Sequence, residues 1–266
     1  MNLPDCSECD LAGAATCHAL RKNSDRRSAL RTARLRRVAR GDSVFDIGDS
    51  PGLIGVVRQG YLRKECLSED GRRSILGLSS PGDILGDMPG RVASYALEAA
   101  TDTEICAFPG PSVAEVARGN VAFWRAILDD VQRQYHQELA FAWLRSALRC
   151  RPRLVAFLLM ASEIMPSAPQ PDGSVIVTIP IGRRDWADLC NMTGESISRQ
   201  MTDLAASGEV QSLGGGRYRL SDPQALRRWP ELAGFPLPAS GRRSPRNVMR
   251  PPHQPHELLL LRATMI

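Results

Sequence analysis

The pattern of hydrophobic and polar positions divides the chain into a part with short alternating runs and a part with long helical runs. From Gly41 to Pro109, short runs in which apolar and polar residues alternate are separated by Gly and Asp. Many short strands bounded by turn residues are typical of an antiparallel β-roll or barrel. Asp70-Gly71 lies between two of these runs and predicts a tight hairpin.

A long helix is predicted after this part, because residues 120–149 contain neither Gly nor Pro. At about 1.5 Å per residue, such a helix is roughly 45 Å long. Positions three and four residues apart form a coiled-coil-like row, which favours pairing with a second copy over packing within one domain. This expected dimer seam consists of Leu128, Val131, Tyr135, Glu138 and Ala142.

The long helix is expected to end before Pro152. A proline fits the first turn of a new helix, predicted over 152–164, because its missing N–H costs nothing there. A loop that contains Pro and Gly is expected over 166–174, and a strand over 175–181.

Residues 183–207 have the pattern of a helix-turn-helix. The first helix is predicted over 183–190 and the second over 194–207, with Thr193 as the N-cap. The second helix has an apolar side and a polar side, formed by Ile197, Met201 and Leu204 and by Glu195, Ser198, Arg199 and Thr202 respectively. A recognition helix presents polar side chains to the major groove, where Arg binds guanine, Glu binds cytosine N4 and Ser binds either base edge.

A Gly-rich hairpin follows this helix pair and is expected to form a wing. Arg217 in that hairpin is placed to contact phosphate. The pattern alone also fits an ordinary amphipathic helix pair, so it does not by itself establish DNA binding.

Composition places the chain among globular proteins rather than membrane proteins. The apolar share is 43%, enough for a sizeable core, but the longest unbroken apolar run is residues 154–161. A membrane span needs about 18 apolar residues or more. The N-terminus has acids where a signal peptide has a basic stretch, so a cytoplasmic protein without membrane contact is expected.

Charge is unevenly distributed along the chain. Residues 21–40 contain nine Lys or Arg and one acid, for which a solvated helix face is expected rather than a binding patch. Residues 236–266 contain six prolines and five arginines, a composition that predicts a disordered tail. No P-loop, zinc-protease or nucleophile-elbow motif is present, and the histidines are scattered, so we expect no enzymatic activity.

The cysteines are the main candidates for chemistry. Three of the seven lie near the N-terminus, and in a reducing compartment such thiols are free, bind a metal or sense oxidation. These three are Cys6, Cys9 and Cys17. A metal site or cluster needs a further ligand, and the pattern alone does not choose among Cys66, Cys106, Cys150 and Cys190. Cys150 and Cys190 are expected to be small buried side chains.

Zinc is the competing occupant of a cysteine site. Structural zinc sites usually present two close pairs of ligands. Only Cys6 and Cys9 form a close pair here, although His18 beside Cys17 is a possible additional ligand.

The segment from Glu195 to Arg199 resembles the E-x-x-S-R recognition motif of the FNR branch of the CRP/FNR superfamily of bacterial transcription regulators. The resemblance covers about residues 1–235 and includes the segment Pro81–Gly86. It implies an α+β fold, with an N-terminal antiparallel β-roll of the cyclic-nucleotide-binding type, a long dimerisation helix and a C-terminal winged helix-turn-helix. The expected units are a cysteine arm at 1–20, the roll at 21–118, the dimerisation helix at 119–150, the DNA-binding domain at 151–235 and the tail at 236–266.

This resemblance also implies a function. Glu195, Ser198 and Arg199 would read the half-sites of a TTGAT-like palindrome in double-stranded DNA, as part of a homodimer that works with RNA polymerase. A [4Fe–4S] cluster would be held by four cysteines and would make the protein responsive to oxygen. The four implied ligands are Cys6, Cys9, Cys17 and Cys106.

Other functions stay open. A redox iron–sulfur protein would leave the recognition helix unexplained, whereas a regulator of the same superfamily could respond to zinc, thiol oxidation, nitric oxide or a small molecule. Cyclic nucleotide binding is disfavoured, because Asp87 and Ser94-Tyr95 stand where the nucleotide-binding branch has a Glu and an Arg-Ser pair. No basic residue is present there to neutralise a phosphate, although Arg91 is close by in sequence.

Glu138 suggests how dimerisation could be controlled. On the seam, Glu138 would lie near its own copy, where like charges repel. The resemblance implies an acid at this point. We therefore expect a largely monomeric cluster-free protein, a dimer when the cluster is intact, and dimerisation in air when Glu138 is replaced by Ala.

Overall fold

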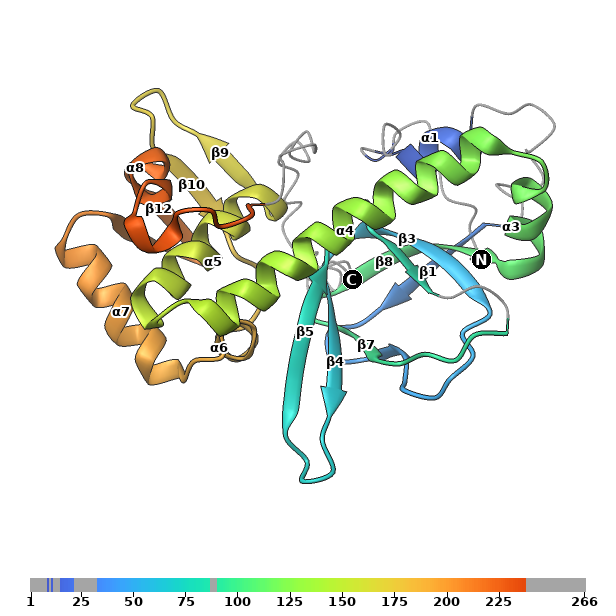
Figure 1. The fold of residues 1–266 in the computed structure, drawn as a ribbon, viewed down its shortest axis with the longest axis horizontal. Coiled ribbons are helices and arrows are strands. Elements are labelled where there is room, and N and C mark those ends of the chain that lie inside the picture. Colours follow the sequence, from blue (N-terminus) through green and yellow to red (C-terminus); the bar gives the residue numbers. More distant parts are fainter. Residues whose placement is uncertain (1–8, 10, 12–14, 22–32, 87–89, 238–266) are drawn as a thin grey trace, which may run out of the picture.

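The structure is a computed structural model that describes residues 9, 11, 15–21, 33–86 and 90–237. Helix α4 (Val121–Ala147) runs across the molecule, with a β-roll at one end and a helical domain with a small sheet at the other (Figure 1). Within the described residues, none of the helices combines the length and the hydrophobicity of a transmembrane segment. The expected tail lies outside the described residues, apart from residues 236 and 237.

The predicted β-roll is confirmed. Two four-stranded antiparallel sheets face each other, in the orders β1-β8-β3-β6 and β2-β7-β4-β5. Their strands are β1 (Arg34–Val38), β2 (Ser43–Phe45), β3 (Leu53–Gln59), β4 (Leu62–Leu67), β5 (Arg73–Ser79), β6 (Ile84–Gly86), β7 (Ala96–Ala99) and β8 (Thr103–Pro109). The interior is apolar, with side chains such as Val57, Leu97 and Ile105 fully buried.

The hairpin predicted at Asp70-Gly71 joins β4 to β5. Gly71 has a φ of +78°, which favours glycine, and its N–H donates to the Ser68 carbonyl at 2.8 Å. The solvated helix expected over 21–40 is wrong where the structure describes it. Residues 34–38 are strand β1, whose residues pair with β8.

The long helix is confirmed in substance. The Asn120 side chain caps α4 by accepting from the Phe123 N–H at 3.1 Å. The chain leaves the helix at Leu148 and Arg149, and α5 (Cys150–Ile164) begins there, with Pro152 in its first turn as predicted. Two short helices flank the roll in sequence. Helix α1 (Ala15–Arg21) comes before its first strand, and α3 (Gly110–Ala117) lies between its last strand and α4.

The C-terminal domain surrounds α5. The apolar run 154–161 lies inside this helix and is at most 1% exposed, so α5 is the centre of the domain core. The remaining elements are β9 (Ser167–Pro169), β10 (Val175–Thr178), α6 (Arg183–Cys190), α7 (Gly194–Ala206), β11 (Val210–Gly214), β12 (Arg217–Leu220), α8 (Pro223–Arg227) and η2 (Pro230–Leu232). Strand β9 corrects the expected loop at 166–174, because Ser167–Pro169 pairs with β10.

One continuous apolar core links the roll to the C-terminal domain. It extends from Ile75 and Leu78 of β5, through Phe141 and Leu144 of α4, into α5. Helix α4 is therefore packed against both domains.

Candidate DNA interface, dimer face and cysteine site

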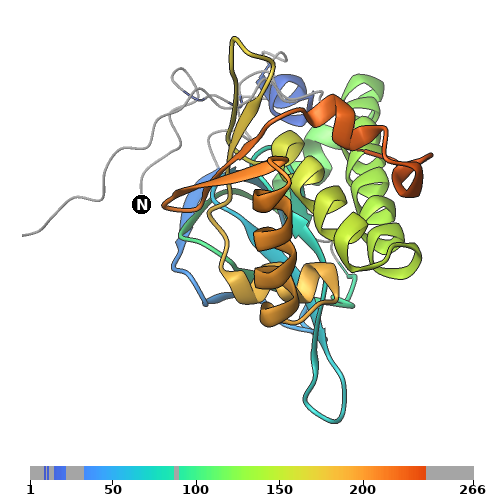
Figure 2. The same cartoon turned by 90° about the vertical axis from the view of Figure 1, so that its left-hand side faces the viewer.

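The helix-turn-helix is formed by α6 and α7, and its first helix has the predicted bounds. Asn191 ends α6 with a φ of +47°, a left-handed conformation that Asn tolerates. The Thr193 hydroxyl accepts from the Ser196 N–H at 3.1 Å, so the predicted N-cap is confirmed. Figure 2 looks onto this domain and shows α7 in full view at its front.

The two sides of α7 are arranged as the pattern predicted. Ile197 and Leu204 are buried in the domain core and Met201 packs against it. The candidate base-reading side chains point to solvent: Glu195, Ser198 and Arg199 are all exposed. Charged and polar side chains on an exposed first half of α7 can enter a major groove without unburying any apolar surface.

The predicted wing is the β11–β12 hairpin, and Arg217 at its turn is exposed. This hairpin is fixed to the helices by aromatic contacts. The Trp186 ring of α6 packs on Tyr218 of β12, with ring centroids 5.3 Å apart. Arg183 lies over the Trp186 ring and donates to the Tyr218 hydroxyl at 3.0 Å. The wing is therefore fixed to α6, the first helix of the helix-turn-helix.

One side of helix α4 is buried against the rest of the chain and carries both polar and apolar side chains. Phe123, Asp130, Gln137 and Leu144, seven residues apart, are all buried. The Gln137 side chain donates to the Leu78 carbonyl at 2.8 Å, so this buried amide has a hydrogen-bond partner.

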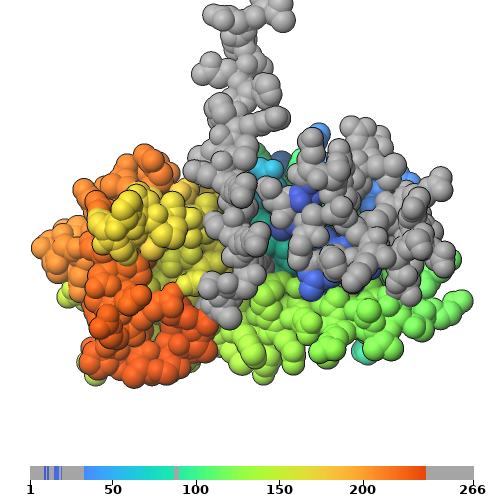
Figure 3. All heavy atoms as spheres, turned by 90° about the horizontal axis from the view of Figure 1, so that it is seen from above, coloured from blue at the N-terminus to red at the C-terminus, as the bar shows by residue number. Residues whose placement is uncertain are grey.

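A second row on α4 is apolar and exposed. Its exposed fractions range from 43% to 82%, a degree that large apolar side chains rarely show over several turns of one helix. The large members are Val121, Trp124, Leu128, Val131, Tyr135 and Leu139. Leu128, Val131, Tyr135 and Ala142 of the expected seam lie on this exposed side. Figure 3 shows α4, in green, along one edge of the molecule.

Glu138 corrects the expected seam. Its carboxylate lies 2.8 Å from Lys64 Nζ on β4, and the missing side chain at Gly77 makes room for it. Its side chain is 30% exposed, and Leu139 continues the exposed row in its place. The expectation that Glu138 faces its own copy is therefore wrong for this structure, because the helix turns this residue toward β4 and β5.

Cys106 lies on the outer face of the roll. Along β8, Ile105 points into the roll core, whereas Cys106 and Phe108 point to the opposite face. Strand β3 shows the same alternation: Val57 is in the core, and Val56, the register partner of Cys106, is on the outer face. The outer face of β8 is where helices α3 and α4 pack through Val113 and Phe123.

Helix α1 brings Cys17 to this same outer face. Cys17 and Cys106 both pack against one small apolar cluster, together with Leu11, Ala19 and Ile127. The structure therefore brings two of the four expected ligands, one from the arm and one from the roll, to a common place.

The other two expected ligands are not assembled with them. Cys9 is partly exposed, and Cys6 lies outside the described residues. Among the residues that the structure describes, no group of three or more His, Cys, Asp or Glu is placed to hold a metal ion. Thiols on the arm and on β8 are a donor set of the kind that holds an iron–sulfur cluster.

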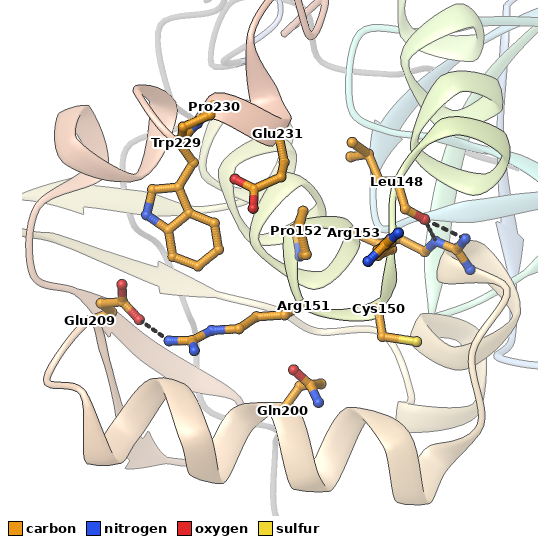
Figure 4. Close-up of a pocket in the computed structure, with 11 residues that line it drawn as sticks. Leu148, Cys150, Arg151, Pro152, Arg153, Gln200, Glu209, Trp229, Pro230 and Glu231 are labelled. Carbon is orange, nitrogen blue, oxygen red and sulfur yellow. Dashed lines mark hydrogen bonds and ion pairs between the residues drawn. The ribbon is translucent and has the colours of Figure 1, made fainter.

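The remaining cysteines divide into buried and exposed ones. Cys190 is fully buried in the helix-turn-helix core, and burial raises the pKa of its thiol far above the usual range. Cys150 is exposed, which corrects the expectation of a buried side chain. It lines an open groove of about 980 Å³ between the start of α5, α7 and residues 229–231 (Figure 4). In that groove Arg151 lies over the Trp229 ring and pairs with Glu209 at 2.8 Å.

Sequence reasoning missed an ionic contact between the two domains. Arg73 of β5 pairs with Asp185 at 3.2 Å and also with Asp188, both on α6. Arg63 of β4 pairs with Asp185 at 3.4 Å and also with Glu98. Asp185 is only 4% exposed, so its charge is balanced by the roll rather than by water.

Comparison with known proteins identifies both domains. Residues 35–120 match the family of cyclic nucleotide-binding domains, and residues 152–229 match the family of Crp-like helix-turn-helix domains. The nitrogen fixation regulation protein FixK of Bradyrhizobium diazoefficiens is 28% identical over 82% of this chain and 90% of its own length. The transcriptional activator protein FnrL of Cereibacter sphaeroides is 24% identical over 80% of this chain and 86% of its own length.

A solved structure has the same fold. FixK2 from Bradyrhizobium japonicum superimposes with a TM-score of 0.66 at 23% identity, covering 73% of this chain and 96% of FixK2. The roll, long helix and winged helix-turn-helix therefore occur in the same order in a known protein. Asp87, which stands near the position of the nucleotide-binding Glu, lies outside the described residues.

Proposed function

Because this chain belongs to the CRP/FNR family of transcription regulators, we propose that it is an oxygen-responsive member whose DNA binding depends on a [4Fe–4S] cluster. The observation that carries the proposal is the meeting of Cys17 and Cys106 at one apolar cluster on the outer face of the roll. Cys6 and Cys9, close by in sequence to Cys17, complete the ligand set. Such a cluster supplies iron–thiolate bonds that persist without oxygen and are lost in air.

The cysteines act by holding the arm against the roll and α4. Helix α1 packs beside α4 through Ala19, Ile127 and Phe123 when Cys17 is at the outer face. This contact lies on the flank of α4, next to the exposed apolar row. A docked arm therefore favours the conformation of α4 in which that row is available to a partner.

The occupant of the exposed row is a second copy of this chain. Apolar side chains three and four residues apart suit a two-stranded helical seam, and CRP/FNR regulators usually act as dimers. A dimer presents two α7 helices, so Glu195, Ser198 and Arg199 of each copy read one half-site of a TTGAT-like palindrome. RNA polymerase is the further partner of a regulator of this type.

The experiment is anaerobic purification followed by iron and sulfide analysis and by exposure to air while the visible spectrum is followed. We expect a coloured protein with iron and inorganic sulfide in equal amounts, which bleaches in air. Cys106→Ser should abolish the colour. Cys66→Ser is the matched control, because Cys66 lies on β4 in the opposite sheet and should leave it unchanged.

Other outcomes would identify other functions. A colourless protein with tightly bound zinc would indicate that the cysteines form a zinc site and not an iron–sulfur cluster. A colourless protein without metal would favour a thiol switch or a small-molecule effector. A Cys106→Ser protein that keeps its colour would show that the fourth ligand is another residue.

A further inference from the structure

Asp130 is a buried acid in the middle of the dimer helix. It is 5% exposed, and its two carboxylate oxygens accept hydrogen bonds from different parts of the chain. Oδ2 accepts from the Thr16 backbone N–H at 3.1 Å and from the Thr16 hydroxyl at 2.6 Å. Oδ1 accepts from the Arg133 guanidinium at 3.1 Å. Both oxygens of a charge removed from water are therefore satisfied, as burial requires.

Arg133 extends this network to the roll. It donates to the Asp83 carboxylate at 2.7 Å and to the Gly82 carbonyl at 3.3 Å. The second oxygen of Asp83 accepts from the Ser80 N–H at 2.6 Å and the Ser80 hydroxyl at 2.9 Å. Burial lowers the pKa of Arg133, but Asp83 and Asp130 raise it more, so its net pKa stands above the usual value. The guanidinium therefore stays charged and keeps α4 fixed to the turn before β6.

This hydrogen-bond network joins the cysteine arm to the exposed row of α4. Thr16 is adjacent to Cys17 in α1, and Asp130 is adjacent to Val131 in the exposed row of α4. Figure 1 shows α1 lying along α4. Thr16 is 2% exposed, so its hydroxyl is removed from water by this contact. A buried carboxylate that loses two of its three donors must find other partners, either water or groups that it reaches by a shift of its side chain and helix turn.

We propose that Asp130 is the positioning residue of the cysteine arm, and that its hydrogen bonds with Thr16 couple the cysteine site to the dimer face. This inference rests on the proposed function, because the cysteine site matters to dimerisation only if its occupancy changes. When no cluster holds Cys17, these hydrogen bonds hold the arm with less support, the arm spends more time undocked, and the α4 turn at Val131 loosens.

The first test measures arm docking in the cluster-free full-length protein. Thr16→Val removes the hydroxyl donor and keeps the shape and the backbone N–H, whereas Asp130→Asn removes the charge. Hydrogen exchange of the amides of residues 15–21 should become at least about tenfold faster in both variants, because a hydrogen bond to a charged group is lost. Asp129→Asn is the matched control, since Asp129 is the exposed neighbour and should change nothing.

The second test measures coupling in the anaerobic protein. Sedimentation should show a dimer dissociation constant at least about tenfold higher for Thr16→Val than for the wild type and Asp129→Asn. The bleaching half-life in air should also shorten. If Asp130→Asn does not fold, as a thermal melt will show, Thr16→Val carries the test alone.

Each outcome decides a part of the proposal. Unchanged exchange in Thr16→Val would overturn the role of Asp130 in holding the arm. Faster exchange with unchanged dimerisation would overturn the coupling. A wild-type protein without a cluster would overturn the proposed function and the coupling with it, and the exchange experiment would still decide whether Asp130 holds α1.

Discussion

At the scale of single residues, the ion pair between Glu138 and Lys64 determines how replacing Glu138 should affect the stability of the chain. Lys64 is 15% exposed on its side chain, and Glu138 is its ion-pair partner on α4. Burial lowers the pKa of Lys64, but the carboxylate of Glu138 raises it more, and the net pKa is above the usual value. A raised lysine pKa gives stability that is present below the unfolded pKa and is lost only as the pH rises through the folded one. At neutral pH the pair therefore contributes fully.

We expect Glu138→Ala to destabilise the chain rather than to create an air-stable dimer. The substitution leaves a mostly buried ammonium without its partner, which should lower the free energy of unfolding by about 1–3 kcal/mol. Urea denaturation of the cluster-free protein measures this. Lys64→Met combined with Glu138→Ala is the control, because removing both charges should restore much of the loss. An equally stable Glu138→Ala protein that dimerises in air would return support to repulsion between copies.

At the scale of elements, the recognition helix and the wing should affect DNA binding in different ways. Arg199 is on the exposed face of α7, and Arg217 is at the turn of the β11–β12 wing. Arg199→Ala should cost about 1–3 kcal/mol in binding to the proposed TTGAT-like palindrome and relax specificity at one base pair. Arg217→Ala should weaken binding to all sequences alike and reduce the salt slope by about one. Titration of palindromic and scrambled DNA at several salt concentrations separates the two, and identical behaviour of both variants would contradict these roles.

Local pattern accounts for the elements that the sequence predicts well. The bounds of α6, the Thr193 cap and the two sides of α7 follow from amphipathic spacing and capping chemistry, which are properties of neighbouring residues. Strand β9 was missed because Ser167–Pro169 has no strand pattern of its own and depends on pairing with β10. The side of α4 that Glu138 occupies depends on Lys64, 74 residues away, so spacing along the helix could not place it.

In the candidate site, too, the sequence predicted the features set by neighbouring residues and missed those set by distant contacts. Spacing along the chain predicted the cysteine site and the apolar row on α4. It gave no sign that Asp130 accepts a hydrogen bond from Thr16, 114 residues away. The sequence signal that could have revealed this contact is the acid at position 130 in the buried row 123–130–137–144, because a buried acid needs a hydrogen-bond partner. Which partner it finds is set by the fold.

At the scale of the whole molecule, the contact between the β4–β5 hairpin and α6 fixes the DNA-binding domain to the roll. Arg73 is 17% exposed on its side chain and faces three acids, Glu65 at 3.6 Å, Asp185 and Asp188. Burial lowers the pKa of Arg73, but Asp188, Asp185 and Glu65 raise it more, and the net pKa is above its usual value. Since α6 precedes the recognition helix, this contact helps to set the direction in which α7 points.

We expect Arg73→Met to loosen the DNA-binding domain while the roll itself stays folded. Methionine keeps the length and apolar stem of the side chain, but it leaves Asp185 and Asp188 short of a counter-charge at a mostly buried place, a loss of about 3 kcal/mol for such a pair. Hydrogen exchange of residues 183–190 should therefore become faster, and the amides of β8 should be unaffected. Arg72→Met is the matched control, because the neighbouring Arg72 is 82% exposed and pairs with Asp70 at the hairpin turn. If both variants exchange alike in α6, the domains are held together by their shared apolar core, and the ionic contact does not orient the recognition helix.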